Sequence, residues 1–232
     1  MLADLVLVGF GHVGRRFARL LDERREALIR DYDLDCRVTG IATRRHGGIY
    51  NAAGVDAIGV ARLIEAGGSL PNLDTEGGRA AVSNSHDVIA RLAASPVALR
   101  VLVETTTLDI DAAQPARDHV RMALEAGCHV VTANKGPVAF AYRELSALAA
   151  RRGVRFLFEG AVMDGVPVFN LVRETMPTVR VEGFRGVVNS TTNHILTALE
   201  NGEEFAPALA HMQAAGIAEA DASLDVDGWD AA

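Results

Sequence analysis

Near its N-terminus the chain runs from a short apolar segment directly into a glycine-rich turn. Leu5–Val8 is apolar at every position, which is typical of a strand buried on both faces of a parallel sheet. Glycines follow with the spacing G-x-G-x-x-G, and a helical pattern begins within the motif. This spacing permits a tight turn, close approach of the backbone to a pyrophosphate, and packing of helix on strand. The predicted cofactor-binding residues are Gly9, Phe10, Gly11, His12, Val13 and Gly14.

Further along the chain, apolar segments alternate with helical patterns. The expected strands are Cys36–Ala42, Arg100–Val103, His129–Val131 and Val154–Phe158, and the expected helices begin near Asp87 and span Ala112–Ala126 and Ala139–Arg152. Such alternation indicates parallel βαβ units. We therefore predict an α/β fold, with a Rossmann-type doubly wound parallel sheet over residues 1–150. Residues 45–84 contain three Gly-Gly pairs around one short helical pattern, Val60–Ala66, and are interpreted as an irregular insertion.

The pattern changes after residue 150, where we place a domain boundary. Helices are expected at Gly165–Met176, Thr192–Glu200 and Pro207–Ala215, and a long strand at Thr178–Val188. Thr192 and Gly202 stand where an N-cap residue and a C-terminal glycine belong. Residues 151–232 are therefore predicted to form a smaller α+β domain.

Composition excludes several classes of protein. The apolar fraction is 49% and the charged fraction 23%, which is ordinary for a soluble globular protein. A net charge of −7 argues against nucleic acid as a partner, because phosphate binding needs a basic surface. We expect no membrane span and no signal peptide. Cys36 and Cys128 are expected to be reduced and buried, and the predicted location is the cytoplasm.

The end of the second expected strand bears on which dinucleotide is bound. An acidic residue there would accept a hydrogen bond from the ribose 2′-hydroxyl and repel a 2′-phosphate. This chain instead has Ala42-Thr43-Arg44-Arg45, which favours NADP over NAD, with Arg44 as the phosphate partner. NAD remains possible, since both arginines could simply be solvated. Thr106, which follows another strand, could contact the nicotinamide or its ribose.

The chain has 23 Lys and Arg residues, of which Lys135 is the one lysine. Lysine provides a compact ammonium that can lose its proton, whereas the guanidinium of arginine cannot. A single lysine directly after an expected strand, in Asn134-Lys135, therefore suggests a specific chemical role.

At this point the sequence resembles homoserine dehydrogenase. The matching blocks are TANKGP at 132–137, FEGAVMDGVPV at 158–168, GVVNSTTNHIL at 186–196 and GIAEADASLDVDGWDAA at 216–232. The resemblance implies reversible NAD(P)-dependent interconversion of L-aspartate 4-semialdehyde and L-homoserine by a homodimer. Two alternatives remain: a truncated NADP-binding paralogue without turnover, or an oxidoreductase acting on another small semialdehyde or amino acid.

The resemblance also implies roles for particular residues. Lys135 would lie near nicotinamide and substrate, and Asp225 and Asp230 would orient the substrate and the catalytic ammonium. Substrate-binding residues would be Gly216, Glu219, Asp225 and Asp230, and catalytic residues Lys135, Asp225 and Asp230. A sodium or potassium ion would be bound by Glu159 with backbone oxygens of Val162, Asp164 and Val166.

In the family, a second lysine follows the acid that matches Asp230 by four residues and donates the proton to the carbonyl oxygen. That position lies just beyond Ala232. We therefore expect a C-terminally truncated chain with an incomplete substrate and dimerisation domain. Low activity is expected, because loss of a general acid costs roughly 10²–10⁴-fold in rate.

Overall fold

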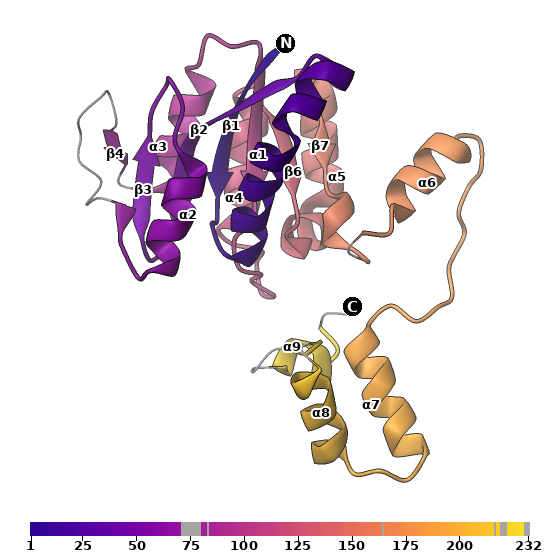
Figure 1. Cartoon of the computed structure of the whole chain (residues 1–232). Coiled ribbons are helices and arrows are strands. Elements are labelled where there is room, and N and C mark those ends of the chain that lie inside the picture. Colours follow the sequence, from indigo (N-terminus) through magenta and orange to yellow (C-terminus); the bar gives the residue numbers. More distant parts are fainter. Residues whose placement is uncertain (71–79, 83, 164, 216, 219–221, 230–232) are drawn as a thin grey trace. The chain divides into compact units, whose positions relative to one another are not determined.

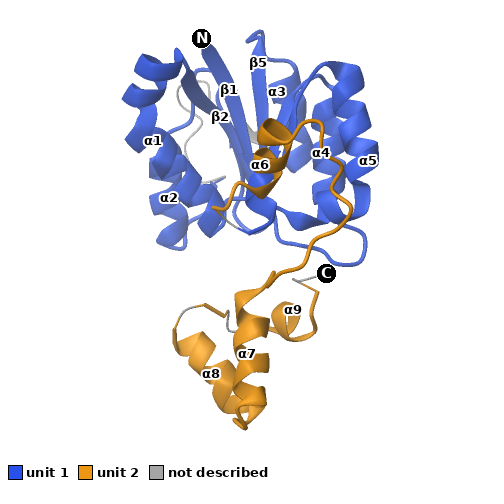
Figure 2. Ribbon diagram, turned by 90° about the vertical axis from the view of Figure 1, so that its right-hand side faces the viewer, with its two compact units in different colours: residues 1–164 blue, residues 165–232 orange. Residues whose placement is uncertain are grey.

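The computed structural model describes residues 1–70, 80–82, 84–163, 165–215, 217–218 and 222–229 (Figure 1). The chain divides into two compact units, Met1–Asp164 and Gly165–Ala232 (Figure 2). The sequence placed the boundary near residue 150, whereas the last strand of the first unit lies at Phe156–Leu157.

The first unit is built on a seven-stranded sheet with the order β4-β3-β2-β1-β5-β6-β7 (Figure 1). Five strands are parallel: β1 Leu2–Val8, β2 Asp35–Thr43, β5 Leu99–Glu104, β6 His129–Thr132 and β7 Phe156–Leu157. From β1 at the centre, the sheet continues through β2, β3 and β4 on one side and through β5, β6 and β7 on the other. The carboxyl ends of β1, β5 and β6 therefore form one edge, where open α/β sheets bind their ligands.

Helices cover both faces of this sheet. On one face, α1 (His12–Tyr32) and α2 (Ala57–Glu65) share a buried core with β1 and β2. On the other, α3 (Ser85–Ala93), α4 (Ala116–Glu125) and α5 (Lys135–Arg152) share a second core with β1, β5 and β6. The predicted doubly wound α/β fold is confirmed. Both cysteines are free, with Cys128 buried and Cys36 half-buried.

The segment interpreted as an irregular insertion contains regular structure. β3 (Gly47–Tyr50) pairs antiparallel with β2, and β4 (Ala80–Val82) pairs antiparallel with β3. These two strands extend the sheet, so the interpretation as irregular is wrong for them. The helical pattern expected at Val60–Ala66 corresponds to α2. The Gly47-Gly48 pair hides β3 in the sequence, because this short strand is stabilised by hydrogen bonds to β2 and β4 rather than by its own residue preferences.

The second unit is helical in the part that the structure describes. It contains α6 (Val168–Thr175), α7 (Ser190–Glu200), α8 (Phe205–Ala214) and the short α9 (Ser223–Val226). One small buried cluster joins α7 to α8, and another joins α8 to Ala218 and Ala222, which precede α9. No helix among the described residues is long and apolar enough to cross a lipid bilayer.

Two sequence predictions for this unit are wrong. The strand expected at Thr178–Val188 is absent, and its apolar side chains are exposed, with Phe184 at 87%. An extended segment forms a strand only when a neighbour satisfies its backbone groups, and none of the described residues pairs with it. The N-cap of α7 is Asn189, not Thr192, because the Asn189 side chain accepts a hydrogen bond from the Thr192 amide.

Candidate dinucleotide site at the carboxyl edge of the sheet

The three glycines of the turn after β1 have different surroundings. Gly9 has a φ of +85°, and an added Cβ would lie 2.4 Å from the Thr105 backbone. At Gly14 the added Cβ would lie 2.7 Å from the Gly9 carbonyl oxygen. At Gly11 it would meet no described protein atom within 4 Å. Gly9 and Gly14 are therefore required by packing of the chain, whereas Gly11 faces open space in which a ligand could lie.

The N-terminus of α1 is suited to an anion. Its N-cap is Gly11, no side chain caps the helix, and no acidic residue lies in the first turn. The first amides of a helix lack intrahelical acceptors and carry a partial positive charge, so they attract phosphate. His12 and Val13 are exposed in this turn. Phe10 is buried, so only its backbone is available to a ligand there.

The end of β2 lies beside this turn, because the Gly9 amide donates to the Ala42 carbonyl over 2.9 Å. The side chain of Thr43 organises the turn into β3: its hydroxyl donates to the Gly47 carbonyl and accepts from the His46 amide. Arg44 and Arg45 are both exposed here. Neither forms an ion pair or side-chain hydrogen bond with a described residue, so their charge is available to an anionic ligand.

The end of β5 carries a buried carboxylate. Glu104 is 0% exposed and accepts hydrogen bonds from the Thr106 amide at 2.9 Å, from the Thr106 hydroxyl, and from the Thr132 hydroxyl at 2.9 Å. Burial raises the pKa of the Glu104 carboxyl, and the hydrogen bonds from both threonines oppose that rise. The adjacent Thr105 hydroxyl donates to the Gly9 carbonyl at 2.8 Å, which joins this strand end to the glycine turn.

The junction of β6 and α5 is tied to the same strand end by Asn134. Its side-chain oxygen caps α5 by accepting from the Gly136 amide at 3.0 Å. Its side-chain nitrogen donates to the Thr106 carbonyl, also at 3.0 Å. Lys135 is the first residue of α5 and is half-buried. The helix dipole disfavours a cation at this end, so electrostatics of the helix alone do not explain the lysine.

Some residues in this cluster were missed by the sequence analysis. Thr106 and Lys135 were predicted from the sequence, whereas no role was predicted for Glu104, Thr132 or Asn134. The signal that could have found them is the position of polar residues directly at the ends of β5 and β6, since buried strands rarely end in a carboxylate without a partner.

The residues implied for a cation fall in both units. Glu159 begins a short 3₁₀ helix, Glu159–Ala161, and Val162 ends it, both within the first unit. Val166 belongs to the second unit, and its carbonyl oxygen accepts from the Val168 amide at 2.8 Å. Asp164 lies outside the described residues. The cation site therefore stays a prediction.

Of the residues implied for substrate, Asp225 is described and lies in α9. Its carboxylate accepts from the Asn189 side-chain amide at 2.8 Å, and its backbone carbonyl accepts from the Thr192 hydroxyl at 2.9 Å. The acid is thus held against the start of α7. Gly216, Glu219 and Asp230 lie outside the described residues, so their roles stay predictions.

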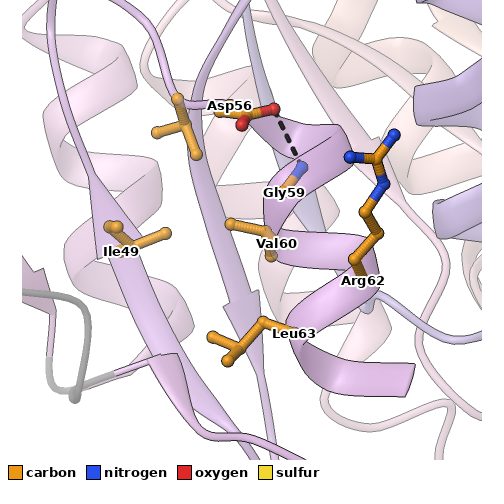
Figure 3. A pocket seen from close by; sticks show the side chains of 7 residues that line it. Ile49, Asp56, Gly59, Val60, Arg62 and Leu63 are labelled. Atoms are coloured by element: carbon orange, nitrogen blue, oxygen red, sulfur yellow. Dashed lines mark hydrogen bonds between the residues drawn. The ribbon is translucent and has the colours of Figure 1, made fainter. Parts of the chain in front are cut away.

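A separate pocket of 380 Å³ lies between β3 and α2 (Figure 3). It is lined by Ile49, Val55, Asp56, Gly59, Val60, Arg62 and Leu63. The Asp56 side chain caps α2 by accepting from the Gly59 amide at 2.8 Å, so it is already engaged. The lining is mainly apolar and shares no residue with the cluster at the carboxyl edge.

The uncapped glycine turn and the polar cluster at the same sheet edge define a dinucleotide-binding protein of the doubly wound class. Comparison with known families agrees and is more specific. The family model described as homoserine dehydrogenase, NAD binding domain, matches residues 9–159, and the one described as homoserine dehydrogenase matches residues 167–232. The chain belongs to the homoserine dehydrogenase family.

Individual relatives support this assignment. The NAD(+)-dependent homoserine dehydrogenase of Pseudomonas canavaninivorans is 37% identical over 97% of this chain and 62% of its own length. The homoserine dehydrogenase of Methanocaldococcus jannaschii is 34% identical over 99% of this chain and 66% of its own length. The present chain thus spans slightly less than two thirds of these relatives.

Solved structures show the same fold. A hyperthermophilic archaeal homoserine dehydrogenase in complex with NADPH superposes with a TM-score of 0.79 at 29% identity, covering 100% of this chain and 66% of that one. A putative homoserine dehydrogenase from Archaeoglobus fulgidus gives a TM-score of 0.78 at 29% identity, covering 99% of this chain and 65% of that one.

Proposed function

We propose that this chain is the nucleotide-binding and partial substrate-binding portion of an enzyme that reversibly reduces L-aspartate 4-semialdehyde to L-homoserine with NADPH. The observation that carries the proposal is the position of Lys135. It starts α5 at the sheet edge that also holds the glycine turn and Thr106. A cation at this place, against the preference of the helix dipole, is suited to an anionic or carbonyl-bearing substrate beside the nicotinamide.

In this proposal the cofactor supplies a hydride to the aldehyde carbon, and the carbonyl oxygen must gain a proton. The Lys135 ammonium orients the substrate beside the nicotinamide with its charge. Asp225, held by Asn189, would orient the substrate amino group, and Gly216, Glu219 and Asp230 complete the proposed substrate contacts. Delivery of that proton by a general acid contributes roughly 10²–10⁴-fold to the rate of such a step.

We propose NADP as the preferred dinucleotide. Arg44 and Arg45 are exposed at the end of β2, where an NAD-specific site would carry an acid. One solved relative was crystallised with NADPH, whereas the Pseudomonas canavaninivorans relative is named as NAD(+)-dependent. Membership of the family is therefore compatible with either cofactor, and the preference for NADP rests on the two arginines.

Two further features are proposed from the family resemblance. A sodium or potassium ion would be bound by Glu159 and the backbone oxygens of Val162, Asp164 and Val166, since hard monovalent cations prefer oxygen ligands. The protein would act as a cytoplasmic homodimer. Comparing thermal unfolding in sodium, potassium and tetramethylammonium chloride tests the ion, because a specific ion raises the unfolding temperature by mass action.

The test of the proposed function is a titration of the chain with NADPH, combined with a dehydrogenase assay using homoserine and NADP. Binding with turnover supports the enzyme, and binding without turnover supports the alternative of a nucleotide-binding protein that lacks activity. Binding with turnover of a different small semialdehyde supports the second alternative. If NADPH and NADH both fail to bind at millimolar concentration, the proposal is wrong.

A further inference from the structure

We propose that Glu104 is a positioning residue for the nicotinamide end of the dinucleotide. Its carboxylate joins the loop after β5 to the β6–α5 junction, so that Thr106 and Lys135 are held in a fixed relation. This inference rests on the proposed binding of a dinucleotide. Glu104 would fix the geometry of the part of the site that binds the nicotinamide ring.

The first argument is the bonding pattern of the carboxylate. One oxygen of Glu104 accepts from both the amide and the hydroxyl of Thr106, while the other accepts from Thr132 in the neighbouring strand. A carboxylate has two oxygens that accept only, and here both are used, one toward the loop after β5 and the other toward the end of β6. Glutamine has one accepting oxygen, so it could not satisfy both sides in the same way.

The second argument is the connection from Glu104 to the start of α5. The Thr132 hydroxyl that donates to Glu104 also accepts from the Asn134 amide at 3.0 Å. Asn134 is the N-cap of α5, so it sets where Lys135 begins the helix. Asn134 also reaches back to the Thr106 carbonyl, which closes the network on itself. A shift at Glu104 would therefore be transmitted to Thr106 and to Lys135 together.

The third argument is a comparison with Asp4, a buried carboxylate in the neighbouring strand β1. Asp4 is 2% exposed and pairs with the Arg37 guanidinium at 2.7 Å, so its charge has a cation beside it. The donors to Glu104 are hydroxyl and amide groups, which are neutral. Burying a carboxylate on neutral donors is costly, and such groups concentrate at functional sites.

The test compares Glu104→Gln with the matched control Asp4→Asn, which alters a buried carboxylate at the opposite edge of the same sheet. Each variant is titrated with NADPH and with 2′-phospho-ADP-ribose, which lacks the nicotinamide. We expect Glu104→Gln to weaken NADPH binding about tenfold, the effect of losing one or two hydrogen bonds. Its affinity for 2′-phospho-ADP-ribose should change less than about twofold, because groups that are far apart contribute nearly independently. Asp4→Asn should change neither affinity.

A second variant guards against poor folding of Glu104→Gln. Thr132→Val keeps the Glu104 carboxylate and its bonds to Thr106 but removes the Thr132 hydroxyl, which donates to Glu104 and accepts from the Asn134 amide. It should weaken NADPH binding about threefold and spare 2′-phospho-ADP-ribose. Equal weakening of both ligands in these variants would mean a purely structural role and would overturn the inference. So would unchanged NADPH binding. If the unaltered chain bound 2′-phospho-ADP-ribose but not NADPH, the positioned nicotinamide site would not exist; if it bound neither, the proposed function itself would fail.

Discussion

The two edges of the sheet use buried charge in different ways. At the amino edge, Asp4 in β1 is neutralised by Arg37 and accepts from the Ser95 hydroxyl at 2.6 Å. At the carboxyl edge, Glu104 in β5 accepts from neutral donors, namely Thr106 in the loop after β5 and Thr132 at the end of β6. The first arrangement holds neighbouring elements together. The second holds the start of the loop after β5 and the end of β6, beside the candidate ligand site. Burial of a charged group alone does not distinguish them; the nature of its partners does.

The largest expected effect is the loss of stability in Gly9→Ala, which is compared with the loss of ligand affinity in Gly11→Ala. Gly9→Ala should cost about 3–5 kcal/mol, because a left-handed φ and a backbone clash each cost about 1–3 kcal/mol. Gly11→Ala should change stability by no more than about 1 kcal/mol but lower NADPH affinity at least about tenfold, since its Cβ would occupy ligand space. Urea unfolding and calorimetric titration measure the two effects. Similar losses of stability in both variants would contradict this division.

His119 tests whether a buried ionisable group must serve the site. It is 1% exposed between α3 and α4, and its ring lies 2.7 Å from the Ser85 hydroxyl. Burial, with a smaller contribution from His86, lowers the pKa of His119 to about 4. The unfolded chain therefore binds the proton more tightly than the folded chain. Stability is fully present above the unfolded pKa and is lost as pH falls from about 6.5 to about 4.

The size of this loss should be about 3 kcal/mol, at about 1.4 kcal/mol for each unit of pKa shift. His119→Gln keeps a polar partner for Ser85 but cannot titrate, so its stability should vary less between pH 7 and pH 4. Urea unfolding at several pH values measures the slope. NADPH affinity at pH 7 should be the same in the unaltered protein and in His119→Gln. A difference would mean that His119 contributes to the dinucleotide site.

Asp4→Asn probes the amino edge directly. The change leaves the Arg37 guanidinium without its anion, but Arg37 is partly exposed and water can compensate in part. We expect a loss of about 1–3 kcal/mol in the free energy of unfolding, less than for a fully buried pair. NADPH affinity should stay the same. An altered affinity in a folded Asp4→Asn protein would show that the two edges are coupled.

The smallest expected effect concerns the choice of dinucleotide at the end of β2. Arg44→Ser should weaken NADPH binding about tenfold through loss of one charge-assisted contact, while NADH binding changes little. Arg45→Ser is the matched control, removing the same charge one residue further along, and its effect on NADPH should be smaller. Equal affinities for NADPH and NADH in the unaltered chain would contradict the preference for NADP.

The sequence predicted the parallel core of the first unit well, because Leu5–Val8 and the following glycines carry strong local signals. It failed where a strand depends on a pairing partner rather than on its own residues. Val179 and Val181 alternate as in a strand, yet no described neighbour pairs with them. β3 was missed because its pairing with β2, not its glycine-rich composition, makes it a strand.

The candidate site divides in the same way. The glycine turn and Lys135 could be selected from spacing and rarity. Glu104 could not, because its bond to Thr132 joins residues that are 28 positions apart. Hydrogen bonds of that kind depend on the register between β5 and β6, which local residue patterns do not determine.

The two hydrogen bonds of the Asn134 side chain bear on the entropy cost of binding at this edge of the sheet. Its side-chain oxygen caps α5 and its side-chain nitrogen donates to the Thr106 carbonyl, so the start of the helix and the loop after β5 are held together in the folded protein. The Thr106 loop and the start of α5 are therefore ordered when the chain folds, whereas a flexible site would be ordered only when the ligand binds. A ligand arriving at this edge loses less of its binding energy to immobilising the protein, so a modest number of contacts can give useful affinity.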